Sequence, residues 1–370
     1  MRTRRQQVRQ RLRRVAAAAV GALGLAAAAV AVEPPGAAAQ ACFAWSGQVP
    51  LQQAVDANTC VEVQAGTYDL DQYLLIADGR TLQGDPDVPR EQIVLRARAP
   101  WNTNGNEGVI TGFQPPHVAV ATVRHLTVDA NGLATGGLGA SDLTIDDVVV
   151  RNGRCWGVAI VGPNMTITDS RIEHNGADPA CPSPPGAGIY AAANGTAYGV
   201  YLPRIIGNEI TANTGPALDV YNVWGGVLLG NDIHDNVGWA AVSLVGSKWT
   251  VQGNRIAHTA GSTGQPHVPA CNGGPGGPWA AALLLCQGTV HDGVNTGGNL
   301  IGGSGARANT IAGFYGVLLI GNDEASARAV PTGNTIAGNH FDGVTVACAD
   351  DTKGIGLNAN SWTGCTPVYF

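Results

Sequence analysis

The sequence is poor in charged side chains and in large apolar residues. Charged residues make up 13% of the chain, and only two methionines, five phenylalanines and two lysines occur among the 370 residues. Glycine, in contrast, occurs 52 times. This composition is typical of a chain in which turns alternate with short strands around a thin aliphatic core.

Basic residues are scarcer still outside the N-terminal segment. Residues 1–41 hold the basic stretch MRTRRQQVRQRLRR, an alanine-rich apolar run and the small-residue sequence AAAQA, which together predict a cleaved signal peptide. A transmembrane anchor is the alternative, but the apolar run is mostly alanine and ends in EPPG. Cleavage removes seven of the 21 basic residues and one of the 27 acidic ones, which leaves 14 and 26 and a net charge near −12.

This negative charge limits the partners that we expect. It argues against a nucleic-acid partner. A polyuronate would also be repelled, unless Ca²⁺ bridged it or a local basic cleft overrode the overall field. With the predicted signal peptide, we expect a secreted, extracellular monomer that has no membrane attachment after cleavage. We expect no cofactor, except Ca²⁺ if the substrate is a polyuronate.

Eight cysteines follow the signal segment, which suits an oxidising compartment. Metal binding is the alternative, but no two cysteines have Cys-x-x-Cys spacing, so we expect disulfides and no metal site. Each pairing of neighbours in the sequence closes a loop of about 15 to 27 residues and contributes about 3 kcal/mol in the chain-entropy model. The predicted disulfides are Cys42–Cys60, Cys155–Cys181, Cys271–Cys286 and Cys348–Cys365.

A Gly-Asn-x-Ile phrase recurs along the chain. Asn208, Asn231 and Asn254 are 23 residues apart, and Asn309 and Asn334 are 25 apart. Ser170 and Val148 hold the same place earlier in the chain. A fixed period in the twenties indicates a solenoid, and the units are too short for a pair of helices.

A second row of apolar triplets with period 2 accompanies the asparagines and predicts one short strand in each unit. Stacked in parallel, these strands would form one long sheet, with the asparagines in a ladder of amide hydrogen bonds. The expected strands begin at Gly157, Gly188, Ala217, Ala241, Gly316 and Gly343.

At this point the sequence resembles the right-handed parallel β-helix proteins of the pectate-lyase-like superfamily. The segment LQQAVDANTCVEVQAGTYDLDQYLLIADGRTLQGD is similar to their entry segment, and GGNLIGGSGARANTIAGFYGVLLIGN to the bacterial form of the repeat. The resemblance implies an all-β solenoid with a short N-terminal capping helix. It does not imply one activity, because this fold carries lyases, hydrolases, epimerases, phage adhesins and non-catalytic surface proteins.

Three insertions interrupt the expected single domain, 42–370, near 176–187, 260–279 and 287–298. The first two enter at the same turn of the coil, so we expect two walls with the sheet between them as the floor of a cleft. Aromatic side chains, among them Trp156, Trp239 and Trp279, occur at nearly the same turn and suit stacking on sugar rings. Covering of the disulfides and loop bases is the alternative role for these tryptophans.

The catalytic motifs of the superfamily are absent, so the candidate site depends on position alone. Asp219 is the expected general acid or base in the cleft, helped by His234 or Asp235. The predicted substrate-binding residues are Tyr190, Tyr221, Trp239, Ser243 and Lys248.

A second acidic position lies beside the asparagines. The outward column of Arg171, Glu209, Asp232 and Arg255 is interpreted as a surface ion-pair ladder, although Glu209 and Asp232 would have the carboxylate spacing of a retaining glycosidase.

Two functions remain open. The first is a polysaccharide-degrading enzyme, a hydrolase of a neutral or weakly charged glycan rather than a lyase of a polyuronate. The second is a non-catalytic extracellular solenoid that binds cell-wall glycan or has a structural role.

Overall fold

The computed structural model describes most of the chain after the N-terminal segment. The described residues are 41–101, 108–112, 120–178, 181, 186–192, 199–258, 269–270, 274–275, 281–286, 296–320, 331–351 and 360–369. The predicted signal segment, Trp279, Cys271 and most of the three predicted insertions lie outside them.

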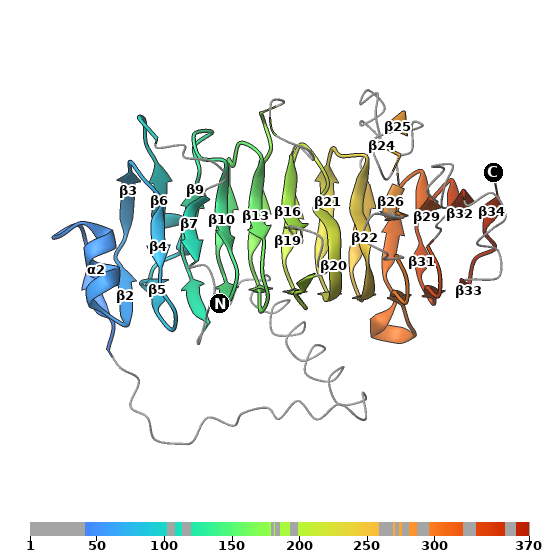
Figure 1. Ribbon diagram of the computed structural model, residues 1–370, viewed down its shortest axis with the longest axis horizontal. Helices are drawn as coiled ribbons and strands as arrows, with labels where there is room; N and C mark the ends of the chain where they lie inside the picture. The colour runs from blue at the N-terminus through green and yellow to red at the C-terminus, as the bar shows by residue number, and fades with distance from the viewer. Residues whose placement is uncertain are drawn as a thin grey trace, which may run out of the picture.

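The described chain winds into a solenoid whose coils lie side by side along the long axis (Figure 1). Each coil contributes strands to three faces, and each strand pairs in parallel with the matching strand of the next coil. We call the three faces face 1, face 2 and sheet B. Faces 1 and 2 form one 22-stranded sheet among the described residues, because β20 and β22 run through both.

The strands follow one another in a regular order. Face 1 holds β4 (Leu74–Ile76), β7 (Gly108–Gly112), β10 (Gly136–Ala140), β13 (Trp156–Ile160), β16 (Ala187–Ala192), the first half of β20 (Leu218–Leu229) and β22 (Ala240–Gln252), β26 (Ala281–Cys286), β29 (Tyr315–Ile320), β32 (Val346–Asp351) and β34 (Val368–Tyr369). Face 2 holds β1 (Phe43–Trp45), β2 (Cys60–Val63), β5 (Thr81–Gly84), β8 (Ala121–Arg124), β11 (Leu143–Asp146), β14 (Thr166–Thr168), β18 (Arg204–Ile206), the second half of β20 and β22, β27 (Leu300–Gly302), β30 (Thr335–Ala337) and β33 (Ser361–Thr363). Sheet B holds β3 (Gly66–Leu70), β6 (Ile93–Ala97), β9 (Thr127–Asp129), β12 (Val149–Arg151), β15 (Arg171–Glu173), β19 (Glu209–Thr211), β21 (Asp232–Asn236), β23 (Arg255–His258), β28 (Thr310–Ala312) and β31 (His340–Phe341).

A few elements lie outside this pattern. The strand β17 (Gly199–Val200) pairs with the middle of β20, and β24 (Pro269–Ala270) and β25 (Gly274–Pro275) form a small antiparallel pair. The described residues contain one α-helix, α2 (Leu51–Ala57), near the N-terminal end of the solenoid (Figure 1). Two 3₁₀ turns, at Arg90–Gln92 and Gly305–Arg307, lie between coils.

The core is a stack of aliphatic side chains inside the three faces. On face 1, Val158, Ile189 and Leu218 lie in register on neighbouring strands and are fully buried. On sheet B, Ile210 and Ile233 do the same. Burial of each such side chain is worth about 1.5–3 kcal/mol, so the thin core is stabilised by repetition. The Ile of the recurring Gly-Asn-x-Ile phrase is thus an inward core residue.

The predicted asparagine ladder is confirmed at the corner between face 2 and sheet B. The Nδ2 of Asn208 donates to Asn231 Oδ1 at 3.0 Å, and Asn231 donates in the same way to Asn254 at 2.9 Å. Each of these amides also donates to a backbone carbonyl of the core. The ladder continues from Asn254 to Asn309 at 3.0 Å.

Two further asparagine ladders were not predicted. Asn175, Asn213 and Asn236 bond to one another at the corner between sheet B and face 1. A third ladder lies between faces 1 and 2 and consists of Asn299, Asn334 and Asn360.

The placement of Asn334 in line with Asn309 was therefore wrong. The partner of Asn309 is Asn339, at 2.9 Å. The phrase GNTIAGN contains two asparagines on either side of the short strand β30. The period alone could not show which one continues the ladder.

The predicted strand positions on face 1 are confirmed except at the C-terminal end. The strand expected from Gly343 begins instead at Val346, because Gly343 adopts a φ of 63° and belongs to a turn. The strand β26, between β22 and β29, was not predicted. Its place on the sheet follows from the pairing of Ala281 with Ala240 and Tyr315.

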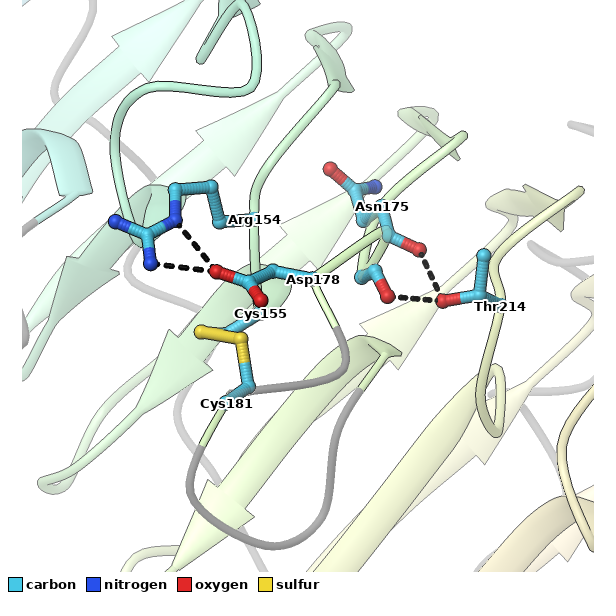
Figure 2. Close-up of a disulfide and its surroundings, with 7 residues drawn as sticks. Arg154, Cys155, Asn175, Asp178, Cys181 and Thr214 are labelled. Atoms are coloured by element: carbon cyan, nitrogen blue, oxygen red, sulfur yellow. Dashed lines mark hydrogen bonds and ion pairs between the residues drawn. A yellow bond between two sulfur atoms is a disulfide. The ribbon is translucent and has the colours of Figure 1, made fainter.

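Three of the predicted disulfides are present, Cys42–Cys60, Cys155–Cys181 and Cys348–Cys365. Cys286 is also in a disulfide, and its predicted partner Cys271 lies outside the described residues. Figure 2 shows Cys155–Cys181 beside the ion pair of Arg154 with Asp178, in which the Arg154 Nε lies 3.0 Å from Asp178 Oδ2. Both links hold the segment after Asn175 against the start of β13.

The helix α2 packs on the first strands of the solenoid. Its apolar side is buried and consists of Leu51, Ala54 and Val55, and it contacts β1, β2 and β4. None of the helices in the described part of the chain has the length and the apolar character needed to cross a membrane.

Candidate functional site

The outer side of face 1 carries a row of side chains in register across successive strands. Tyr190 pairs with Asp219, and Asp219 pairs with Ser243. All three were predicted from the sequence as site residues. Strand alternation holds, since the residues on either side of Asp219 are the core residues Leu218 and Val220.

Asp219 is not the exposed residue that was expected on a cleft floor. It faces away from the core and is nevertheless only 7% exposed. Burial raises the pKa of its carboxyl to about 7, although a hydrogen bond with the Ser243 side chain opposes the shift. Ser243 is also buried. The outer side of face 1 is therefore covered at Asp219 and Ser243. The carboxyl of Asp219 keeps its proton up to near neutral pH.

Two tyrosines stand beside Asp219. Tyr190 is half-buried, and its pKa is raised to about 12 by burial and by the nearby Asp219 and Tyr221. The ring of Tyr190 stacks on Trp156, with centroids 5.8 Å apart and an interplanar angle of 26°. Tyr221, two residues beyond Asp219 on the same strand, is 36% exposed. Tyr190 is the cross-strand neighbour of Asp219 and Tyr221 follows it along β20, so two phenol rings lie next to the carboxyl.

His234 and Asp235 do not join this cluster, contrary to the prediction. They lie on β21 in sheet B, whereas Asp219 lies on face 1. The His234 Nδ1 is 2.7 Å from Asp235 Oδ2, and its Nε2 is 3.6 Å from Glu209 Oε1. The corner at Asn231 separates β20 from β21, so outward side chains of the two strands belong to different faces.

The remaining predicted binding residues lie at the margins of face 1. Trp239 is half-buried and packs on the apolar cluster that includes Ala240 and Tyr315. Lys248 is exposed at the corner between faces 1 and 2, with its Nζ 4.7 Å from the centroid of the Trp224 ring. This cation–π contact is a surface interaction of the kind worth about 0.5–1 kcal/mol.

The outward column of charges on sheet B is confirmed in its register. Arg171, Glu209, Asp232 and Arg255 are successive partners. Asp232 and Arg255 form an ion pair at 2.8 Å, and both side chains are more than half exposed. Arg171 pairs with Glu173 at 3.1 Å and with Glu91 at 3.8 Å. Solvated, paired charges of this kind support the interpretation as a surface ladder.

A separate pocket that the sequence did not reveal lies at the N-terminal end, between α2 and β3. Its volume is about 390 Å³, and Tyr68, Tyr73 and Asp69 are among its lining residues. Asp69 pairs with Arg96 at 2.8 Å, and Asp71 pairs with Arg98 at 3.6 Å. Because its carboxylates are engaged in ion pairs and exposed to solvent, the buried carboxyl of Asp219 is the stronger candidate for chemistry. Among the described residues, no three metal-ligating side chains gather in one place.

The comparisons with known proteins agree with this architecture. A family model described as "Right handed beta helix region" matches residues 156–265. No curated protein matches the sequence. Among solved structures, ORF18 of Geobacillus virus E2 is similar with a TM-score of 0.58 and 15% identity, over 86% of this chain and 57% of that one. The chain thus spans little more than half of ORF18.

Two weaker similarities extend over most of the chain. The A-module of the mannuronan C-5 epimerase AlgE4 of Azotobacter vinelandii has a TM-score of 0.47 and 14% identity, over 86% of this chain and 92% of that one. The catalytic domain of a GH87 alpha-1,3-glucanase has a TM-score of 0.42 and 15% identity, over 92% of this chain and 56% of that one. Parallel pairing on three successive faces shows that the described chain is a parallel β-helix, and the matching family model identifies residues 156–265 as a right-handed β-helix region.

Proposed function

We propose that the protein is secreted and acts on extracellular polysaccharide at the outer side of face 1, with Asp219 as the general acid. The observation that carries this proposal is a carboxyl that faces away from the core and is buried, with a pKa raised to about 7. Perturbed groups of this kind concentrate at functional sites.

The β-helix itself does not need a carboxyl at this position. The core depends on the inward neighbours Leu218 and Val220, and the corners depend on asparagine ladders. Ionising Asp219 in its buried place costs on the order of 4 kcal/mol, as the shift of its pKa implies. A polar residue that is costly to the fold and absent from its repeat is best explained by chemistry.

The geometry suits proton donation to a glycosidic oxygen. A carboxylic acid that keeps its proton near pH 7 can protonate a leaving group, as the acid does in glycoside hydrolysis. Tyr190 and Tyr221 flank the acid, and aromatic side chains stack well on sugar rings. Ser243, beside Asp219, and Trp239 and Lys248, at the margins of the same face, remain proposed contacts.

A second function, glycan binding without catalysis, is favoured by one observation. Hydrolysis requires a second group to act as base or nucleophile. Within the described part of the chain, no other carboxylate lies in the outward row of Asp219, whose neighbours are Tyr190 and Ser243.

The proposal also includes the processing, the cofactor and the partners of the protein. Residues 1–41 would be the export signal, 42–370 the mature domain, and α2 the cap of the core. Ca²⁺ would take part only if the substrate were a polyuronate. The protein would act as a monomer, without nucleic-acid or membrane partners.

The test measures product formation from a panel of neutral and acidic polysaccharides. The wild type, Asp219→Asn and the control Asp232→Asn are compared by new reducing ends and by unsaturated-uronate absorbance. If Asp219 is the general acid, Asp219→Asn slows the reaction by about 10²- to 10⁴-fold, and Asp232→Asn does not. Equal rates for Asp219→Asn and the wild type would remove Asp219 from the mechanism. Retention on a glycan affinity gel without any product would establish the binding solenoid instead.

A further inference from the structure

The outward row of face 1 is partly exposed on the N-terminal side of Asp219, although Ala159 within it is only 4% exposed, and it is buried on the C-terminal side. Toward the C-terminus the row continues through Ser243, Leu284, Leu318 and Ala349, which are 4%, 2%, 0% and 0% exposed. Toward the N-terminus it continues through Tyr190, Ala159, Gly139 and Thr111. Tyr190 and Gly139 are both partly exposed. A ligand that reaches Asp219 along the row therefore approaches from the N-terminal coils.

The outer side of β10 has no side chains at two of its positions. Among the described residues, the Ala159 Cβ, at 3.9 Å, is the one atom within 4 Å of a Cβ placed at Gly139. Gly136, the preceding outward position of β10, is covered by the Cδ1–Nε1 edge of Trp156, which reaches back from β13. We call the surface formed by Gly136, Gly139 and Ala159 the small-residue strip.

Two buried polar atoms border the small-residue strip and lack a partner. Neither Trp156 Nε1 nor Thr111 Oγ1 makes a hydrogen bond with any residue that the structure describes. Trp156 is only 6% exposed. Buried N–H groups are nearly always paired, so the indole N–H over Gly136 calls for an acceptor that a bound molecule can supply.

The indole is held rigidly in this position. Its ring stacks on Tyr190, and it packs in one cluster with Ala159 and the disulfide of Cys155 with Cys181. Figure 2 shows this disulfide next to the ion pair of Arg154 with Asp178.

We infer that the small-residue strip binds neutral sugar units of the polysaccharide on the N-terminal side of Asp219, with the Trp156 indole N–H donating to a sugar oxygen. The inference rests on the proposed function. Neutral sugars are favoured because the outward residues here, Thr111, Gly136, Gly139, Trp156, Ala159 and Tyr190, carry no charge. The absence of a side chain at the partly exposed Gly139 leaves room for a sugar ring beside the stacked aromatics.

The first test fills the small-residue strip. Gly139→Phe adds a side chain into open space, and Thr144→Phe adds the same side chain on face 2 of the same coil, where Thr144 pairs with Thr166. Titration calorimetry with the neutral oligosaccharide that the wild type binds best should show a loss of about tenfold or more in affinity for Gly139→Phe. The control should stay within about twofold of the wild type.

The second test follows the indole directly and does not depend on how a variant folds. The ¹H–¹⁵N indole resonance of Trp156, assigned with Trp156→Phe, should move downfield when the neutral oligosaccharide is added. An unmoved resonance, wild-type affinity of Gly139→Phe, or binding of acidic glycans alone would each overturn the inference while leaving the proposed function standing. A wild type that binds no glycan at all would overturn both.

Discussion

Tyr190 and Asp219 are direct neighbours across β16 and β20, on the outer side of the sheet. Burial raises the pKa of Tyr190 to about 12, and the charge on Asp219 adds to this. Burial raises the pKa of Asp219 to about 7. At acidic pH both groups are therefore neutral, and ionisation of Asp219 near neutral pH creates the first charge in the pair.

This pair predicts that stability falls as pH rises through the acidic range. In the unfolded chain the carboxyl of Asp219 has its ordinary pKa of 3.8, whereas in the folded protein its pKa is about 7. The folded state thus binds more protons between these values, and the free energy of unfolding decreases across that window. Asp219→Asn removes this contribution. Urea titrations at pH 4.5 and 8 should therefore show Asp219→Asn gaining stability relative to the wild type, by about 3 kcal/mol between the two pH values. A constant difference between the two proteins would contradict the buried carboxyl.

The pH dependence of the catalytic rate should reflect the ionisation of Asp219. If Asp219 acts as a general acid, the rate declines as the pH rises past about 7, because the proton that it donates is lost. A pH profile of kcat on the most active substrate checks this. A profile that stays flat to pH 9 would show that another group supplies the proton.

The asparagine ladder predicts a stability effect without an effect on binding. Asn231 is 2% exposed, donates to Asn254 and to the Ile205 carbonyl, and accepts from Asn208. Asn231→Ala leaves these buried groups unsatisfied and should cost about 1–3 kcal/mol in the free energy of unfolding.

The measurement for Asn231→Ala is urea unfolding. Gln92→Ala, at an exposed site, serves as the control and should change little. Glycan affinity of the folded Asn231→Ala protein should match the wild type. A stable variant with lost binding would mean that this corner belongs to the functional site.

The disulfides predict strong sensitivity to reductant. Cys42–Cys60, Cys155–Cys181 and Cys348–Cys365 close separations of 18, 26 and 17 residues, each worth about 3 kcal/mol in the chain-entropy model. The thermal midpoint of the mature protein should fall markedly in dithiothreitol. Ellman titration of the denatured, unreduced protein should find almost no thiols, and a count of eight would refute both the disulfides and the expectation of export.

The charge column on sheet B predicts a small effect. Asp232 and Arg255 are paired at 2.8 Å with side chains 52% and 56% exposed. Asp232→Asn should therefore change the free energy of unfolding by less than about 1 kcal/mol, with activity unchanged. A large loss of activity would instead place the chemistry at Glu209 and Asp232.

The sequence by itself was sufficient for the repeat, the period-2 strands and three of the disulfides described here. Each of these depends on local spacing. An inward Ile such as Ile233 after a corner asparagine recurs with the coil, and parallel stacking then brings Tyr190, Asp219 and Ser243 into one row. Register in a solenoid follows from the period because each coil contacts only its neighbours.

The tertiary structure decided what the period could not. Strand alternation shows that Asp219 faces outward, but only the folded chain shows that it is buried and that its pKa is raised. The chain turns the corner at Asn231, between β20 and β21. This corner places His234 on a different face from Asp219. Burial and the choice between Asn334 and Asn339 depend on how whole coils and their insertions pack, and no short pattern in the sequence encodes that packing.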